Sequence, residues 1–208
     1  MTVNPKPSLL DPNDLSPNQL AKRKKIIQAA GRVMVRDGIA ACTARSVTAE
    51  SGMSTSAMHY YFSDTDEILD LAFRSVMEGF LDLIESAAAR HENPVRALWA
   101  AANAYFERSS DSIRATGEHG EQHAPMIWFE FHAQSLRTGN ITTVKELSDR
   151  GSAFFQTLLE RCDVEAPQQK AETLYCALLG AAVRDSLSRR PTSEWVASLF
   201  AALALPLP

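Results

Sequence analysis

Basic side chains gather in one segment of the chain. Between Leu20 and Ser63 there are seven basic residues and only two acidic ones, which gives this segment a formal charge of +5. The whole chain has a net charge of −4, so the other 164 residues carry −9. Lysine and arginine attract nucleic-acid phosphates whatever the base sequence. The distribution indicates a local face for a polyanion, although the cluster Lys22–Lys25 alone is also compatible with a solvated helix end.

Aromatic residues gather after residue 70, and the segment around Trp128 combines them with polar groups. Trp128, Phe131 and His132 share one face of a helix. A carboxylate such as Glu130 beside aromatic faces can hold a cationic ligand, while a solvated acid and simple core packing are the alternatives. We expect a mostly apolar cavity for a small molecule, lined by Phe73, Phe80, Trp99, Phe106, Trp128, Glu130, Phe131, His132 and Phe155.

A second polar cluster offers weaker chemistry. His119 and His123 are four residues apart, the spacing at which a helix presents two imidazoles to one metal ion. Gly117 and Gly120 disfavour a helix there, and no third ligand is evident in the sequence. We therefore expect a solvated loop, with no metal ion and no cofactor.

Composition narrows the class of protein further. The chain has 208 residues, of which 45% are hydrophobic and 22% charged, enough for a substantial core. No apolar run is long enough to span a membrane, and no secretory signal is evident at the start. The three cysteines form no CxxC pair and are expected to be reduced thiols, which favours the cytoplasm. No G-x-S-x-G, phosphate-loop or H-E-x-x-H motif is present, so an enzyme is not expected.

The elements that must position these residues are nearly all helices, which predicts an all-α fold. Ser16, Pro17 and Gln19 form a capping box before the first helix, and Gly38 is a candidate left-handed cap at its end. We expect a flexible tail over 1–16, a small helical unit over 17–66 that contains the basic segment, and a larger helical unit over 67–208. A long helix is predicted to start at Ser63 or Asp64 and to cover about 64–91, and another helix to start at Pro94. Further helices are predicted over 127–136, 141–162, 167–189 and 195–205. Residues 109–124 are predicted to form a loop.

Two short helices within the basic segment are joined by a tight turn at Gly52-Met53-Ser54. Thr43 can cap the first and Ser54 the second, and glycine permits the sharp turn between them. This arrangement is the pattern of a helix-turn-helix, whose second helix lies in the major groove of DNA.

The run from Thr43 to Phe62, TARSVTAESGMSTSAMHYYF, resembles the DNA-binding signature of the tetracycline-repressor (TetR) family. Thr-x-Arg, Gly-hydrophobe-Ser and the closing Tyr-Phe fall in one register. The resemblance implies N-terminal helix-turn-helix domains that bind double-stranded operator DNA, and C-terminal helical bundles that dimerise and bind an effector. Carried over by position, it implies DNA contacts from Thr43, Arg45, Thr55, Ser56, His59, Tyr60 and Thr65. We also expect DNA contacts from Lys24 and Lys25 of the basic segment and from Ser54 at the start of the second short helix.

Several positions depart from the family pattern. The family often has a basic residue at Thr55, Gly at Ser56, Tyr at His59 and Lys at Thr65. The recognition helix is therefore uncharged at neutral pH apart from His59, and affinity is expected to depend on the basic segment and Arg45. Phe62 and Tyr61 are expected to pack beneath the helix, whereas for Tyr60 packing and DNA contact are equal alternatives. The segment around Trp128 also resembles the betaine-responsive subgroup of the family.

The resemblance predicts a ligand-responsive homodimeric repressor that a small aromatic or cationic effector releases from a palindromic operator, without a membrane partner. The helix over 64–91 would link effector and DNA. A helical interaction protein with a vestigial DNA-binding head is the alternative. A four-helix seam between two copies is expected from residues of the helices over 141–189, namely Leu147, Gly151, Phe154, Leu158, Leu159, Leu174, Leu178, Ala181 and Ala182, with packing inside one chain as the alternative.

Overall fold

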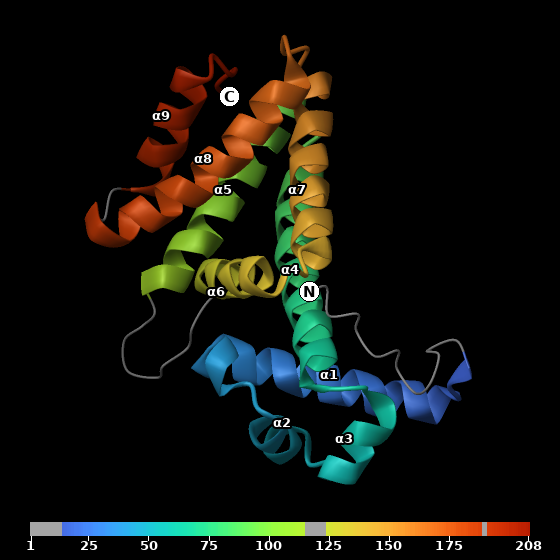
Figure 1. The fold of residues 1–208 in the computed structure, drawn as a ribbon. Helices are drawn as coiled ribbons and strands as arrows, with labels where there is room; N and C mark the ends of the chain where they lie inside the picture. The colour runs from blue at the N-terminus through green and yellow to red at the C-terminus, as the bar shows by residue number, and fades with distance from the viewer. Residues whose placement is uncertain (1–13, 115–123, 189–190) are drawn as a thin grey trace.

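The computed structural model describes residues 14–114, 124–188 and 191–208, and within these ranges all regular structure is helical (Figure 1). This confirms the all-α prediction. Most of the tail predicted over 1–16 lies outside the described residues, as do His119 and His123. None of the described helices is both long enough and apolar enough to cross a membrane.

Four helical elements form an N-terminal unit that we call the head, residues 14–63. Its elements are α1 (Pro17–Asp37), the 3-10 turn η2 (Ile39–Ala41), α2 (Ala44–Ser51) and α3 (Thr55–Tyr61). In Figure 1, α2 and α3 lie below α1. Val47 is fully buried and Met53 partly buried in the same hydrophobic cluster, as expected for side chains that fill the angle of a helix-turn-helix.

Local capping explains where the helices of the head begin. The Ser16 hydroxyl and the Gln19 side chain form the predicted capping box, and Thr43 forms a second one with Ser46. Gly52 ends α2 with φ 65° and ψ 19°, a left-handed conformation that favours glycine. Gly38 has φ 86° but ψ 168°, so the predicted left-handed cap there is wrong: the extended ψ leads the chain directly into η2.

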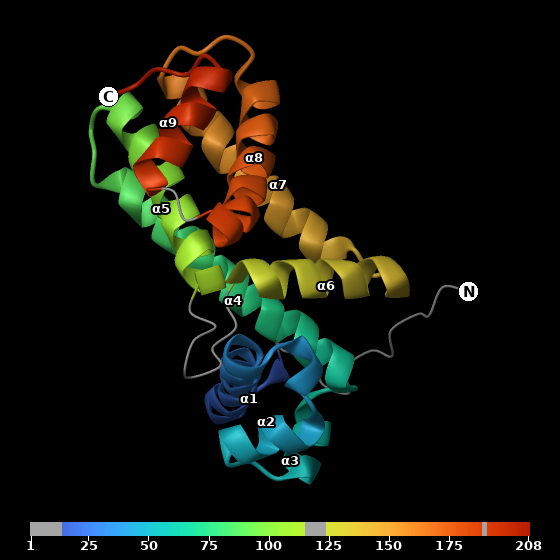
Figure 2. The same cartoon turned by 90° about the vertical axis from the view of Figure 1, so that its left-hand side faces the viewer.

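A long helix rises from the head and the remaining helices pack along it. Asp64 caps α4 (Thr65–Ala89). It is followed by α5 (Pro94–Arg114), α6 (Ala124–Thr138), α7 (Thr142–Arg161), α8 (Pro167–Ser188) and α9 (Thr192–Ala202). The loop predicted over 109–124 is wrong in its first part, because α5 continues to Arg114. Figures 1 and 2 both show α6 lying crosswise between the head and the upper helices.

Buried side chains form two hydrophobic clusters, which we call the lower core and the upper core. The lower core joins the head to the first half of α4, to α6 through Ile127, Trp128 and Phe131, and to the start of α7. The upper core is built from α5, α8, α9 and the distal parts of α4 and α7. Leu81 belongs to the lower core and Ile84 to the upper one. The clusters therefore meet within α4, whereas the domain boundary at 66/67 stays a prediction.

The residues predicted for a seam between two copies mostly pack inside one chain. Leu147, Leu158, Leu159, Leu174, Leu178, Ala181 and Ala182 are all buried in the single chain. Gly151 faces Tyr175 so closely that a Cβ atom added there would come within 2.6 Å of the tyrosine ring. These side chains are not available to a partner, so that part of the prediction is wrong, because an apolar stripe does not reveal whether its partner helix is in the same chain.

Candidate functional site

The outer face of α3 carries most of the predicted base-contacting residues. Thr55, Ser56, His59 and Tyr60 are exposed there. On the opposite side of α3, Met58 and Tyr61 are buried, and Phe62 follows them into the lower core. The prediction that Tyr61 and Phe62 pack beneath the helix is confirmed. A short polar face is thus held outward by an apolar one, as insertion into a DNA groove requires.

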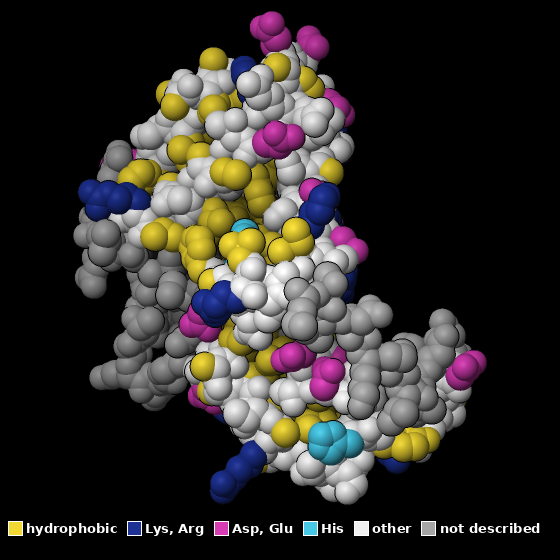
Figure 3. Space-filling view, in the orientation of Figure 1, with side chains coloured by type: hydrophobic (Ala, Val, Ile, Leu, Met, Phe, Trp, Pro, Cys, Tyr) yellow, Lys and Arg dark blue, Asp and Glu magenta, His cyan; other side chains and the backbone are white. Residues whose placement is uncertain are grey.

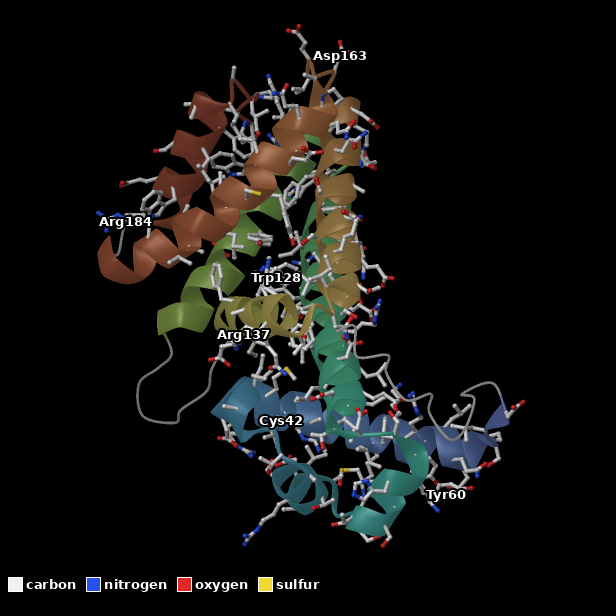
Figure 4. All side chains as sticks on the ribbon, viewed as in Figure 1. Cys42, Tyr60, Trp128, Arg137, Asp163 and Arg184 are labelled. Atoms are coloured by element: carbon white, nitrogen blue, oxygen red, sulfur yellow. The ribbon has the colours of Figure 1, made fainter. Side chains whose placement is uncertain are left out.

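Tyr60 is held in place by the start of α1. The Gln19 side-chain amide donates to the Tyr60 hydroxyl at 3.1 Å, while the Gln19 carbonyl oxygen accepts from the Ser16 backbone N–H at 2.9 Å. Figure 4 shows Tyr60 at the end of α3, beneath the N-terminal half of α1. Tyr60 is 48% exposed. Sequence analysis found Gln19 only as a capping residue, because its second partner is far along the chain.

Three of the seven basic side chains in the basic segment form ion pairs with acidic residues. Arg32 pairs with Glu50 at 2.7 Å, Arg36 with Asp37 at 2.8 Å and with Glu50 at 3.0 Å. Hydrogen bonds from Arg32 and Arg36 lower the pKa of Glu50. The third committed cation is Arg23, which binds Glu67. These pairs reduce the positive charge available to a polyanion.

Arg23 clasps the head to the start of α4. Its guanidinium lies 2.8 Å from the Glu67 carboxylate and 4.9 Å from the centre of the Phe62 ring. The other oxygen of Glu67 accepts from the backbone N–H and the hydroxyl of Ser63, at 2.9 Å and 3.0 Å. Arg23 therefore has a structural role that composition alone does not distinguish from a role in binding.

The remaining cations are the ones open to a ligand. Lys22, Lys24, Lys25 and Arg45 are exposed, and they form no ion pair with any residue that the structure describes. The first three lie on α1 and Arg45 on α2. The predicted contacts Lys24, Lys25 and Arg45 are thus the free cations of the head, together with Lys22.

Three predicted polar contacts have capping or flanking positions. The Thr43 hydroxyl accepts from the Ser46 N–H at 3.2 Å, and the Ser54 hydroxyl from the Ala57 N–H at 3.1 Å. Thr65 is the first residue of α4 and is half-buried. Their predicted DNA contacts stay predictions, and the caps they form fix the starts of α2 and α3.

The predicted small-molecule residues divide between the two cores. Phe73 stacks on Phe131 with ring centres 3.8 Å apart and lies 5.8 Å from Trp128. His132 contacts Trp128 at 6.3 Å between ring centres. Figure 4 shows Trp128 on α6 where this helix crosses α4. These four rings belong to the lower part of the molecule, against the head.

Of the other predicted aromatic residues, three lie in or against the upper core, and Phe80 packs against both cores. Phe106 and Phe155 are buried there, with Phe80 and Trp99 partly buried against them. Two tyrosines outside the predicted set, Tyr105 and Tyr175, also belong to this region, and their ring centres are 5.4 Å apart. Burial raises the pKa of Tyr175 to about 12. No local sequence signal marks this pair, because its partners lie on α5 and α8.

Glu130 faces the head. Its carboxylate accepts a hydrogen bond from the Ile39 backbone N–H at 3.1 Å. Two hollows are resolved elsewhere: one of about 590 Å³ between α1 and α4, lined by residues such as Gly31 and Val76, and one of about 450 Å³ beside Pro167. None of the predicted small-molecule residues lines either hollow. Among the described residues, no three His, Cys, Asp or Glu side chains are grouped to hold a metal ion.

Comparison with known proteins shows that this chain is similar to bacterial transcriptional regulators. Residues 26–72 match the model of "Bacterial regulatory proteins, tetR family". The chain is 38% identical over 69 residues to the transcriptional regulator PksA of Bacillus subtilis, a match that covers 33% of this chain and 34% of PksA. It is 26% identical over 177 residues to the regulator BetI of Rhizobium meliloti, covering 83% of this chain and 81% of BetI.

Solved structures share the fold over nearly the whole chain. The multidrug binding protein EbrR was solved with imidazole and with proflavin. The imidazole complex is 24% identical, covers 90% of this chain and 96% of EbrR, and has a TM-score of 0.64. The similarity therefore extends from the head through the upper helices.

Proposed function

Since the chain belongs to the TetR family of bacterial regulatory proteins, we propose that it is a homodimeric repressor that a small molecule releases from a palindromic operator. The family assignment makes it a DNA-binding transcriptional regulator. The observation that carries the proposal is the head: an outward polar face on α3 flanked by four cations that no acid neutralises. A protein with a vestigial DNA-binding head has no need to keep these cations unpaired.

The DNA contacts are proposed from exposure and charge. Thr55, Ser56, His59 and Tyr60 would meet base edges or phosphates, and Lys22, Lys24, Lys25 and Arg45 would meet phosphates. Thr43, Ser54 and Thr65 would flank them at helix starts, where backbone N–H groups also suit phosphate. Because α3 has no lysine or arginine, most of the electrostatic attraction must come from α1 and α2.

Selection of bound genomic fragments by the purified protein tests this proposal, followed by titration of the selected duplex at several salt concentrations. Arg45→Ala is expected to weaken binding and to reduce the slope of log K against log salt by about two, one for each subunit of the proposed dimer. Lys145→Ala changes a residue that is exposed on α7 and serves as the control. It should leave both the affinity and the salt slope unchanged. Failure to enrich any fragment would favour the interaction protein with a vestigial head, whereas equal binding by Arg45→Ala would exclude Arg45 from the proposed contacts.

The effector is proposed to be aromatic or cationic. Support comes from the aromatic side chains that line both cores, and from EbrR, a structural relative solved with imidazole and proflavin. Phe80 and Trp99 are the predicted residues only partly buried in the upper core, and with the neighbouring Tyr105–Tyr175 pair they offer both aromatic faces and hydroxyls. Titration with proflavin, followed by its fluorescence, tests this class of ligand; release of the operator duplex by bound proflavin would support an effector role.

The dimer is proposed to use the outer face of α8. Thr173, Cys176 and Gly180 are exposed on one stripe of this helix, and the space beyond Gly180 is open. Figure 3 shows hydrophobic side chains on the surface between α8 and α7, above α6. A second copy packed here would bring two Cys176 thiols together across the two-fold axis.

Oxidative cross-linking tests this seam. In a Cys162→Ser background, copper-phenanthroline should yield a disulfide-linked dimer, and Cys176→Ser should abolish it. A dimer seen by sedimentation without any Cys176 cross-link would place the seam elsewhere.

A further inference from the structure

One hydrogen bond ties α6 directly to the head. The Ile39 backbone N–H donates to the Glu130 carboxylate at 3.1 Å, across 91 positions of sequence. The Ile39 side chain is 6% exposed and belongs to the lower core, and Glu130 is half-buried. An N–H group in such a place loses free energy if its acceptor leaves without water taking its place. The bond therefore favours one position of α6 against η2.

On the head side, this bond fixes the start of the helix-turn-helix. Ile39 is the first residue of η2, and the Ala41 carbonyl of η2 accepts from the Ser46 hydroxyl at 2.6 Å. Ser46 is also the partner of Thr43 in the box that begins α2. A displacement of η2 is thus passed on to α2, which carries Arg45.

On the other side, Glu130 is set in a rigid part of α6. Trp128 and Phe131, which flank it in sequence, are both buried and both lie against Phe73 of α4. Figure 2 shows α6 passing between the head and the upper helices. Because packed aromatic rings move together rather than independently, a shift of α6 carries the Glu130 carboxylate with it.

We propose that Glu130 is a positioning residue through which α6 holds η2 and α2 in the arrangement that binds the operator. This inference rests on the proposed function, in which the ligand-free protein is the DNA-binding form. A molecule that displaces α6 would separate the carboxylate from Ile39 and free η2, so the same bond supplies a difference in energy between the two states, as ligand control requires.

Hydrogen exchange of the Ile39 amide, measured by NMR on the full chain, tests the bond itself. In Glu130→Ala the exchange rate is expected to rise at least tenfold. Glu130→Gln keeps an oxygen acceptor and should stay within threefold of the wild type. Gln134→Ala, one turn further along α6, is the matched control and should leave the rate unchanged. An unchanged rate in Glu130→Ala overturns the inference.

Operator titration tests what the bond does. With the duplex selected by the wild-type protein, Glu130→Ala should bind about fivefold more weakly, while Glu130→Gln and Gln134→Ala bind as the wild type does. Equal affinity in Glu130→Ala overturns the positioning role even if the exchange rate rises. If the wild type itself selects no duplex, the proposed function and the operator role both fall, while the exchange rates still decide whether Glu130 holds η2.

Discussion

The lower and upper cores are built from similar aromatic and aliphatic residues but differ in what they join. The lower core connects the helix-turn-helix to α6 and to the first half of α4, whereas the upper core packs α5, α8 and α9 together. The change from one core to the other takes place within α4, between Leu81 and Ile84. The DNA-binding head is therefore not a separate globule attached to a bundle, because its core continues into the region that we expect to respond to a ligand.

Polar contacts also distinguish the lower core from the upper core. Glu130 bonds to Ile39 and Arg23 bonds to Glu67, so the head has a hydrogen-bonded connection to α6 and an ion pair with α4. Within the upper core the rings of Tyr105 and Tyr175 contact each other edge to face, with centres 5.4 Å apart. The lower core thus has polar connections to the head, whereas the dimer seam and the ligand contacts that we propose use the upper helices.

The largest effect is expected from truncation of a core ring. Phe73 and Phe106 are each fully buried, one in each core. Phe73→Ala and Phe106→Ala should each cost about 3–5 kcal/mol of unfolding free energy, measured by urea unfolding at one fixed protein concentration. For binding, the milder Phe73→Leu should weaken operator affinity while Phe106→Leu does not. Equal loss of affinity in both would mean that the two cores act as one.

A smaller effect with opposite signs is expected at two helical glycines. Gly151→Ala pushes a Cβ atom to within 2.6 Å of the Tyr175 ring, and this overpacking should cost about 1–3 kcal/mol. Gly79→Ala meets open space and should stabilise the protein by about 0.5–1 kcal/mol, because alanine is the better helix former. Thermal unfolding of both variants measures the difference, and a stabilised Gly151→Ala would contradict the tight packing of the upper core.

Two arginines of the head, Arg23 and Arg32, should contribute differently to the free energy of unfolding. Arg23→Ala removes the clasp to Glu67 and Phe62 and should cost about 1–3 kcal/mol. Arg32 is more exposed, with 55% of its side chain accessible, so Arg32→Ala should change stability by less than about 1 kcal/mol. Urea unfolding measures both. Equal costs would show that burial does not distinguish these ion pairs.

The last effect is confined to alkaline pH and concerns a buried thiol of the lower core. Burial raises the pKa of Cys42 from 9.0 to about 11. The unfolded thiol therefore loses its proton first as the pH rises, so the contribution of Cys42 to stability is present below pH 9 and is lost between about 9 and 11. The advantage of the wild type over Cys42→Ala should shrink over this interval when unfolding free energies are compared. A constant difference would indicate that the thiol is not protected from water.

Sequence alone gave reliable predictions where the physics is local. The caps at Ser16, Thr43, Ser54 and Asp64 involve partners three residues away, so the types and spacing of the residues are sufficient. Similarly, the alternation of exposed and buried positions in α3 follows from the helical period.

Long-range pairing could not be predicted in the same way. Glu130 was expected near a cationic ligand, yet its partner in the structure is an amide 91 positions away. Arg23 was counted with the free cations because Glu67 lies 44 positions away. The residues named for the seam were wrong for a related reason: the apolar stripes of α7 and α8 pack against each other within one chain. The polar residues before Arg114 suggested a loop, but polar side chains are compatible with a helical backbone.

Hydrogen exchange followed by mass spectrometry, on wild type, Phe73→Leu and Phe200→Leu, tests most directly whether α6 belongs with the head. Phe200 is fully buried on α9 in the upper core. The predicted result is that Phe73→Leu speeds exchange in α1 and α6 together, while Phe200→Leu speeds exchange in α9 and leaves α6 unchanged. Faster exchange of α6 in Phe200→Leu, with α1 and α6 unaffected in Phe73→Leu, would show that α6 belongs with the upper core and not with the head.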